Sequence, residues 1–181
     1  LLDNTVIVIY GDHDAKLKTS EYEYLYNFDP ETQTMLDVND PDYHKVDAYE
    51  YELNRKVPFI IWTKDKKFNV EVKEVMGMYD VLPTLGNMLG FESEYALGHD
   101  MFSVDENIVV FPDGNWLTNK MYYNNQTGEA KLIDPTQPVT IDYIEKNCKH
   151  ADEVVTVSNS IITYDLIRKT KESEDLLKKY K

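Results

Sequence analysis

The sequence predicts a mixed α/β protein, on the strength of two observations. Two apolar runs rich in β-branched residues, 5–10 and 57–62, are typical of strands in a sheet that is buried on both faces when complete. A helix-like segment follows at 80–90, and short strand-like segments separated by turns fill 107–133. Strand, long connection, strand and helix in this order indicate an α/β sheet. A small antiparallel β meander and C-terminal helices are expected to follow it.

Length and charge narrow the possible classes of function. The chain has 181 residues, which is enough for one domain, or one domain with a small appendage, around a real core. Its 33 acidic residues outnumber its 19 basic residues and give a net charge of −14. This charge argues against nucleic acid or an anionic lipid surface as partner, because like charges repel. It favours a metal ion, a cationic ligand or simply a solvated acidic surface.

The first strand runs into Gly11 and a polar segment. The connection that follows, from about 15 to 56, is rich in Tyr, Asp, Glu and Asn. Within it, the alternation at 21–26 predicts a half-buried strand, and 37–47 reads as an acidic loop. Connections of this length are usually functional or insertions.

The helix expected at 80–90 has recognisable ends. Asp80 is a plausible N-cap, Pro83 falls in the first turn, and Gly90 suits a left-handed C-terminal position. These signals predict a short helix directly after the second apolar strand and the polar stretch that follows it.

The remainder of the chain predicts the meander and two helices. Four short strands are expected, at 107–111, 115–117, 120–123 and 130–133. One helix is expected from Thr140 and a second from about 150 to 171. The change of character predicts two domains, 1–103 for the sheet and 104–181 for the β-plus-helix part.

The strongest candidate for chemistry is the segment Gly-Asp-His-Asp at 11–14. Ligands of open α/β sheets bind outside the carboxyl ends of the strands, which is where this segment lies. Asp12 offers a hard oxygen and His13 an imidazole, a mixture that suits Mn²⁺, Zn²⁺ or a related divalent ion. Taken alone, an Asp-His pair after a strand is as well explained by a structural role.

A family resemblance changes that balance. It is carried by Val-Ile-Tyr-Gly-Asp-His at 8–13, Val-Pro-Phe-Ile-Ile at 57–61 and Tyr-Asp-Val-Leu-Pro-Thr-Leu at 79–85. In this order the segments resemble the sulfatase and alkaline-phosphatase superfamily, and most closely its lipoteichoic acid synthase and phosphoglycerol transferase branch. Segments 96–103 and 109–114 are similar to the same branch, so the resemblance spans about 1–132. It implies the C-terminal part of a sulfatase-like α/β sheet.

The resemblance also implies roles for single residues. Asp12 and His13 match the pair that helps to bind a divalent metal in that family. Manganese is the expected ion in this branch, with zinc or magnesium as alternatives. The family's catalytic Thr, an acidic ligand and a substrate-binding His all precede the matching segment and are expected upstream of this chain. No catalytic residue is therefore expected here, and the chain alone is expected to be inactive.

Two departures bear on the kind of enzyme. Asp14 stands where typical sulfatases have Gly, which argues against sulfatase activity. Cys148, the single cysteine, lacks the Cys-x-Pro-x-Arg context of a formylglycine site and excludes both an internal disulfide framework and a Cys-based zinc site. His44 and His99 are weak candidates for substrate contacts, since an acidic loop and a solvent-facing turn explain them better. The tyrosines at 22, 24 and 26 could stack on a sugar or lipid headgroup, but a half-buried strand accounts for them.

The resemblance implies a membrane-anchored phosphoglycerol transferase at the extracellular face of a bacterial cell membrane. Its substrate would be a lipid-linked glycerol phosphate, and its upstream part would hold the membrane anchor and partner this chain. The apolar strands are expected to be partly uncovered, so that the chain self-associates. Two alternatives remain: a sulfatase or phosphoethanolamine transferase of the same superfamily, and a non-catalytic cell-wall-binding module.

Overall fold

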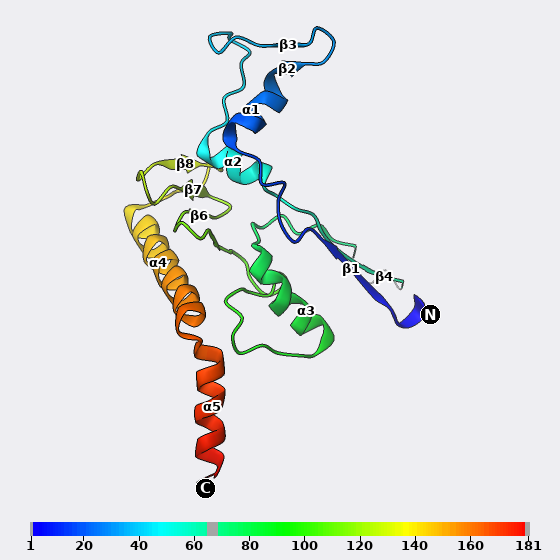
Figure 1. Cartoon of the computed structure of the whole chain (residues 1–181), viewed down its shortest axis with the longest axis vertical. Coiled ribbons are helices and arrows are strands. Elements are labelled where there is room, and N and C mark those ends of the chain that lie inside the picture. The colour runs from blue at the N-terminus through cyan, green and yellow to red at the C-terminus, as the bar shows by residue number, and fades with distance from the viewer. Residues whose placement is uncertain (1, 65–68, 180–181) are drawn as a thin grey trace. The chain divides into compact units, whose positions relative to one another are not determined.

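The computed structural model describes residues 2–64 and 69–179, and their contacts divide the chain into two units. The first unit is Leu1–Glu71 and the second is Val72–Lys181 (Figure 1). The fold class is confirmed, because the chain is mixed α/β with antiparallel sheets, a four-stranded meander and C-terminal helices. The unit boundary precedes the domain boundary expected after residue 103, which stays a prediction.

A two-stranded antiparallel ribbon forms the sheet of the first unit. After the short 3₁₀ helix η1 (Leu2–Asn4), β1 (Val6–Tyr10) pairs with β4 (Phe59–Thr63) over five residues of each strand. Figure 1 shows the two strands side by side, in blue and blue-green. Ile9 is 55% exposed and Ile60 is 51% exposed, so the expectation of partly uncovered apolar strands is confirmed. Burial on both faces is not reached among the described residues, because no further strand pairs with this ribbon there.

The segment expected to be a half-buried strand at 21–26 is a helix instead. It belongs to α1 (Thr19–Asn27), whose first turn is held by the Lys18 N–H donating to Glu21 Oε2 at 2.7 Å. Tyr22 and Tyr26 are four residues apart and share one helical face, a spacing that an alternating pattern also satisfies. The prediction was wrong because packing of that face, and not the local pattern, decides between the two structures.

The packing partner of α1 is α2 (Ala48–Asn54). The Tyr22 ring meets the Tyr51 ring edge-on, with 5.9 Å between centroids. Tyr26 Oη donates a hydrogen bond to Asn54 Oδ1 at 2.5 Å. The three tyrosines therefore do not form one aromatic row, since Tyr24 lies elsewhere on α1.

The strands β2 (Phe28–Asp29) and β3 (Thr34–Met35) form a small hairpin after α1. The chain then returns to α1 through the buried amide of Asn27. Asn27 Nδ2 donates to the His44 carbonyl at 2.8 Å, and Asn27 Oδ1 accepts from the His44 N–H at 2.7 Å. This pair of bonds fixes the end of the acidic loop against α1.

A buried carboxylate organises the start of the second unit. The 3₁₀ helix η2 (Met78–Asp80) leads into α3 (Val81–Leu89), and the Asp80 side chain is completely buried. Its oxygens accept from the Gly77 N–H at 2.8 Å, the His99 N–H at 2.7 Å and Asn107 Nδ2 at 2.9 Å. Asp80 thus joins three separate segments of chain.

The helix predicted at 80–90 is confirmed, with one correction at its start. Asp80 occupies the N-cap position of α3, but its side chain makes no capping bond to that helix. The carboxylate instead accepts the three hydrogen bonds from Gly77, His99 and Asn107. Gly90 ends α3 in the left-handed conformation at φ 76°, as predicted.

The predicted antiparallel meander is confirmed. Its strands are β5 (Val109–Val110), β6 (Trp116–Leu117), β7 (Met121–Tyr123) and β8 (Ala130–Leu132), paired in sequence order. Each strand is one to three residues shorter than its predicted segment, because strand ends give way to turns. Gly114 and Gly128 occupy left-handed positions in the turns, where a side chain would strain the backbone.

Two helices end the chain, but they divide later than predicted. Thr140 caps α4 (Ile141–Tyr164), its hydroxyl accepting an N–H of the first turn at 3.2 Å. Asp165 then adopts a left-handed conformation, and α5 (Leu166–Lys179) follows. The second helix was expected to begin near residue 150, yet α4 continues through this point. None of the described helices is long and apolar enough to cross a membrane.

The core of the second unit explains why α4 does not break. Four buried residues form that core: Val110, Trp116, Met121 and Ala151. Ala151 comes from the middle of α4, with Val154 and Val155 packed beside it. Interrupting the helix near residue 150 would remove this face from the meander. Cys148 also packs against the core, as expected of an ordinary thiol.

Candidate functional site

The candidate site is the loop that follows β1. Its first residue, Gly11, donates its N–H to the Pro58 carbonyl at 3.2 Å. A Cβ atom added to Gly11 would lie 2.7 Å from Val57 Cβ, which is closer than real Cβ contacts. Only glycine permits this approach, so the loop begins tightly held against the start of β4.

Asp12 and His13 lie close enough to serve one ion. Asp12 Oδ1 is 3.8 Å from His13 Nε2, and the two side chains are 83% and 60% exposed. Strand neighbours point to opposite faces, whereas this turn brings two consecutive side chains together. Both therefore lie where the sequence predicted a ligand pair, although their role as metal ligands stays a prediction.

The second ring nitrogen of His13 is already occupied. His13 Nδ1 lies 2.7 Å from the Asp14 carbonyl oxygen, a distance that requires the proton to be on Nδ1. In the neutral imidazole with Nδ1 as donor, Nε2 carries the lone pair and can bind a metal. Metal-ligating histidines are commonly oriented by a bond of this kind from the other nitrogen.

Asp14 has a role that sequence reasoning missed. Its carboxylate is only 11% exposed, and Arg55 Nε donates to Asp14 Oδ2 at 2.9 Å. Arg55 Nη1 also donates to Glu52 Oε2 at 3.0 Å, and the Glu52 side chain is 7% exposed. Burial alone would lower the pKa of Arg55, but the carboxylates of Glu52 and Asp14 outweigh burial and raise it. The only signal in the sequence was that Arg55 is one of just two arginines in an acidic chain.

The two weak histidine candidates have other surroundings. The His44 ring packs on Tyr26 with 4.4 Å between centroids, and His44 Nε2 is 3.6 Å from Glu50 Oε2. His99 belongs to the other unit, where its N–H is held by Asp80 and its side chain is exposed. Among the described residues, no hydrogen bond or ion pair joins the His44 side chain to the loop that carries His13.

Asp12 and His13 fit a divalent ion as part of a ligand set. A carboxylate oxygen and an imidazole nitrogen suit Mn²⁺ or Zn²⁺, which want four or more ligands. Within residues 2–64 and 69–179, no group of three or more His, Cys, Asp or Glu side chains could hold a metal. The pair could therefore supply two ligands, and a complete site would need others.

Comparisons with known proteins show which proteins the chain is similar to. No family model matches the chain. Lipoteichoic acid synthase 1 of Bacillus subtilis is 31% identical to it over 179 residues, and the lipoteichoic acid synthase of Staphylococcus aureus strain USA300 is 28% identical over 177 residues. The chain matches the C-terminal segment of lipoteichoic acid synthases. Each match covers 93% of this chain and 24% of the relative, so the chain spans about a quarter of the length of these curated relatives.

The resemblance to the lipoteichoic acid synthase branch, expected from five short motifs, is thus confirmed. The Staphylococcus aureus enzyme of strain COL matches to the same extent as that of strain USA300. In this synthase-like chain, the motif at 8–13 supplies the candidate ligands, and the motif at 79–85 supplies the buried Asp80.

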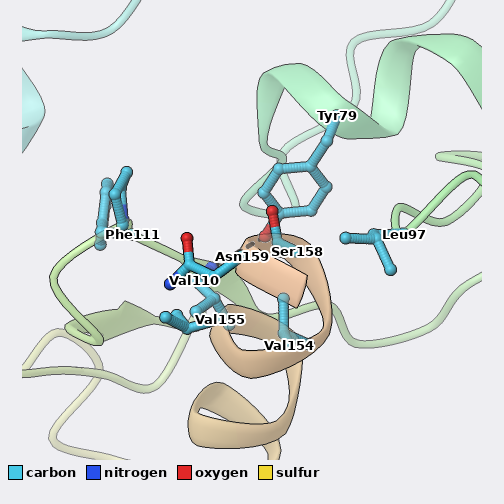
Figure 2. Close-up of a pocket in the computed structure, with 9 residues that line it drawn as sticks. Tyr79, Leu97, Val110, Phe111, Val154, Val155, Ser158 and Asn159 are labelled. Carbon is cyan, nitrogen blue, oxygen red and sulfur yellow. Dashed lines mark hydrogen bonds between the residues drawn. The ribbon is translucent and has the colours of Figure 1, made fainter. Parts of the chain in front are cut away.

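A separate hollow lies in the second unit of the synthase-like chain (Figure 2). It has a volume of about 210 Å³ and is bounded by α4 on one side, with Val154, Val155, Ser158 and Asn159. Figure 2 shows the Tyr79 ring reaching across it toward α4. The lining holds no Asp, Glu, His, Lys, Arg or Cys, and its only hydroxyl groups are those of Tyr79 and Ser158, so the hollow has no evident chemistry.

Tyr79 is expected to make the stability of the second unit depend on alkaline pH. Its hydroxyl accepts from the Val110 N–H at 2.8 Å, and burial raises the pKa of the phenol from 10.0 to about 12. Between these values the unfolded chain ionises while the folded chain does not. The free energy of unfolding is therefore expected to fall by about 2–3 kcal/mol as pH rises through this window.

The substitution Tyr79→Phe is expected to reduce this alkaline loss. Phenylalanine cannot ionise, so neither state gains from high pH at this position. Urea unfolding at neutral and alkaline pH would measure the difference, with Tyr164→Phe, an exposed tyrosine on α4, as the control. Equal alkaline slopes for Tyr79→Phe and the wild type would contradict the assignment.

Proposed function

We propose that this chain is the C-terminal part of a metal-dependent phosphoglycerol transferase of the lipoteichoic acid synthase kind. The whole enzyme would transfer a glycerol-phosphate group from a lipid headgroup to a growing polymer or glycolipid. The observation that supports this proposal is the proximity of Asp12 Oδ1 and His13 Nε2, 3.8 Å apart, in a chain that matches these synthases.

Asp12 and His13 would contribute two ligands to one divalent ion. Manganese is the expected ion, and zinc or magnesium are alternatives. When bound, such an ion stabilises negative charge on the phosphoryl oxygens and on an attacking oxygen. Asp12 would bind as a carboxylate, and His13 would bind through Nε2 while Nδ1 keeps its bond to the Asp14 carbonyl.

The charge of the chain gives an independent reason for a cation. With a net charge of −14, the chain repels a phosphate-containing lipid or polymer. A bound cation at an exposed Asp-His pair would give the substrate phosphate a local point of attraction. The proposed partners are the lipid-linked glycerol phosphate and the upstream part of the same enzyme.

The nucleophile, the remaining ligands and the membrane anchor would belong to that upstream part. The proposed location is the extracellular face of a bacterial cell membrane. The chain on its own is expected to show no turnover, because loss of an activated nucleophile removes several orders of magnitude in rate.

The test compares ligand variants in the full-length parent enzyme. Asp12→Ala and His13→Ala are each expected to lower the release of glycerol phosphate from a labelled lipid by about 100-fold or more, since changes even outside the ligand shell lose 10–100-fold. Asp152→Ala, which removes an exposed carboxylate from α4, is the matched control and is expected to retain full activity. Unchanged turnover in both ligand variants would contradict the proposal.

Two further arms separate the alternatives. An aryl sulfate and a phosphoethanolamine lipid are offered to the same full-length enzyme, and faster turnover of either would replace the proposed substrate class. The isolated chain is assayed with a chromogenic phosphodiester in Mn²⁺. Hydrolysis that Asp12→Ala abolishes would show that the isolated chain is active, contrary to expectation.

A further inference from the structure

We propose that Arg55, held by Glu52, is a positioning residue that fixes the His13 imidazole through Asp14. This inference rests on the proposed function, since it concerns how the metal-binding pair is held. It assigns a purpose to α2 and to the long connection between β1 and β4. Within the described part of the chain, Arg55 has no hydrogen bond or ion pair with His13, so its effect would pass through Asp14.

Residue 14 links the two ends of this arrangement. Its side chain accepts from Arg55 Nε at 2.9 Å, and its carbonyl accepts from His13 Nδ1 at 2.7 Å. Clamping the carboxylate limits rotation of the Asp14 backbone, so the carbonyl stays aimed at the imidazole. The bond to Arg55 spans 41 residues of sequence and ties the loop after β1 to the end of α2.

Arg55 is itself fixed in place. It is the C-cap of α2, its Nη1 donates to Glu52 Oε2 at 3.0 Å, and its guanidinium lies 5.7 Å from the centre of the Tyr51 ring. One planar guanidinium thus engages two carboxylates and an aromatic face. A lysine offers a single point charge and cannot reproduce this geometry.

The carboxylates that bind Arg55 are much less exposed than the two candidate metal ligands. The carboxylates of Asp14 and Glu52 are 11% and 7% exposed, whereas His13 and Asp12 are 60% and 83% exposed. An imidazole this exposed has little packing to hold it. The bond from Nδ1 to the Asp14 carbonyl therefore sets both the tautomer and the direction of Nε2.

The first test measures the tautomer of His13 without any metal. Nitrogen-15 NMR of the full chain at neutral pH is expected to show the proton on Nδ1 in the wild type. Arg55→Ala and Asp14→Ala are expected to give the tautomer mixture of a free imidazole. Arg55→Lys keeps the positive charge but lacks the planar set of N–H donors. It replaces Arg55→Ala in this test if the alanine variant does not fold. Wild-type tautomer in Arg55→Lys and Asp14→Ala would overturn the inference.

The second test measures Mn²⁺ affinity by calorimetry, in salt that suppresses diffuse binding to the acidic surface. Arg55→Ala is expected to weaken site binding by about 10-fold, as loss of supporting contacts around ligands does. Arg168→Ala is the matched control, because it removes the other arginine, which pairs with Asp165 and Glu172 on the surface of α5. Its affinity and its His13 tautomer are expected to equal those of the wild type.

The outcomes distinguish this inference from the proposed function. If Asp12→Ala and His13→Ala weaken Mn²⁺ binding but Arg55→Ala behaves like Arg168→Ala in both tests, the positioning role is wrong and the metal site stands. If neither ligand variant changes Mn²⁺ binding, the metal site is wrong. In that case the inference fails as a statement about a metal ligand, even where the tautomer shifts as expected.

Discussion

Replacing Asp80 by alanine is expected to lower the free energy of unfolding of the second unit by about 3–5 kcal/mol. The substitution removes the acceptor of three hydrogen bonds, from the Gly77 N–H, the His99 N–H and Asn107 Nδ2. The carboxylate is completely buried, so water cannot replace it without opening the site. Each donor left without a partner costs about 1–3 kcal/mol.

The measurement is a urea titration followed by Trp116 fluorescence in a Trp62→Phe background, which leaves one tryptophan in the second unit. Asp80→Asn is expected to lose less stability than Asp80→Ala. The amide oxygen can still accept a hydrogen bond, whereas the NH₂ group faces donors and cannot. Asp152→Ala makes the same change as Asp80→Ala at an exposed position and should leave the midpoint unchanged. An Asp80→Ala midpoint equal to that of Asp152→Ala would refute the role given to this carboxylate.

Trp116→Ala is expected to lower the stability of the same unit by about 3–5 kcal/mol, the usual result of truncating a buried tryptophan. Trp116 has no exposed surface and is part of the core between the meander and α4. Its ring stacks on Tyr123 with 5.4 Å between centroids and meets Tyr143 edge-on at 6.3 Å. Alanine would leave a cavity between the meander and α4. This cavity could close only if the sheet or the helix shifted.

The matched variant is Trp116→Phe. The indole N–H of Trp116 has no acceptor among the described residues, so phenylalanine gives up no hydrogen bond and keeps an aromatic ring in the core. Its loss should be clearly smaller than that of Trp116→Ala. Urea unfolding followed by helical circular dichroism measures both variants. Equal losses for the two variants would contradict the role given to packing of the aromatic ring.

Elements fixed by near neighbours in sequence were predictable. The meander was expected because turn residues separate its strands, and Gly114 and Gly128 do occupy left-handed positions in those turns. The end of α3 was expected for the same reason, since Gly90 needs no distant contact to adopt its conformation. Local backbone preference decides such features, and the sequence alone displays it.

Elements fixed by distant contacts were not predictable. The pattern at 21–26 fits a strand as well as a helix, and only the packing of Tyr22 and Tyr26 on α2 selects α1. The continuation of α4 past residue 150 depends on Ala151 meeting the meander.

In the candidate site too, some features were predictable from the sequence and others depend on distant contacts. Asp12 and His13 were identified from the sequence, because two ligand types follow a strand within a motif of the lipoteichoic acid synthase branch. The partnership of Asp14 with Arg55 joins residues 41 apart, and the burial of Asp80 depends on donors at three separate positions. Residues that could bind a metal are recognisable in the sequence, because ligand capacity is a property of side-chain chemistry. The way they are held emerges only from the folded chain, because a hydrogen bond between residues 41 apart does not exist before folding.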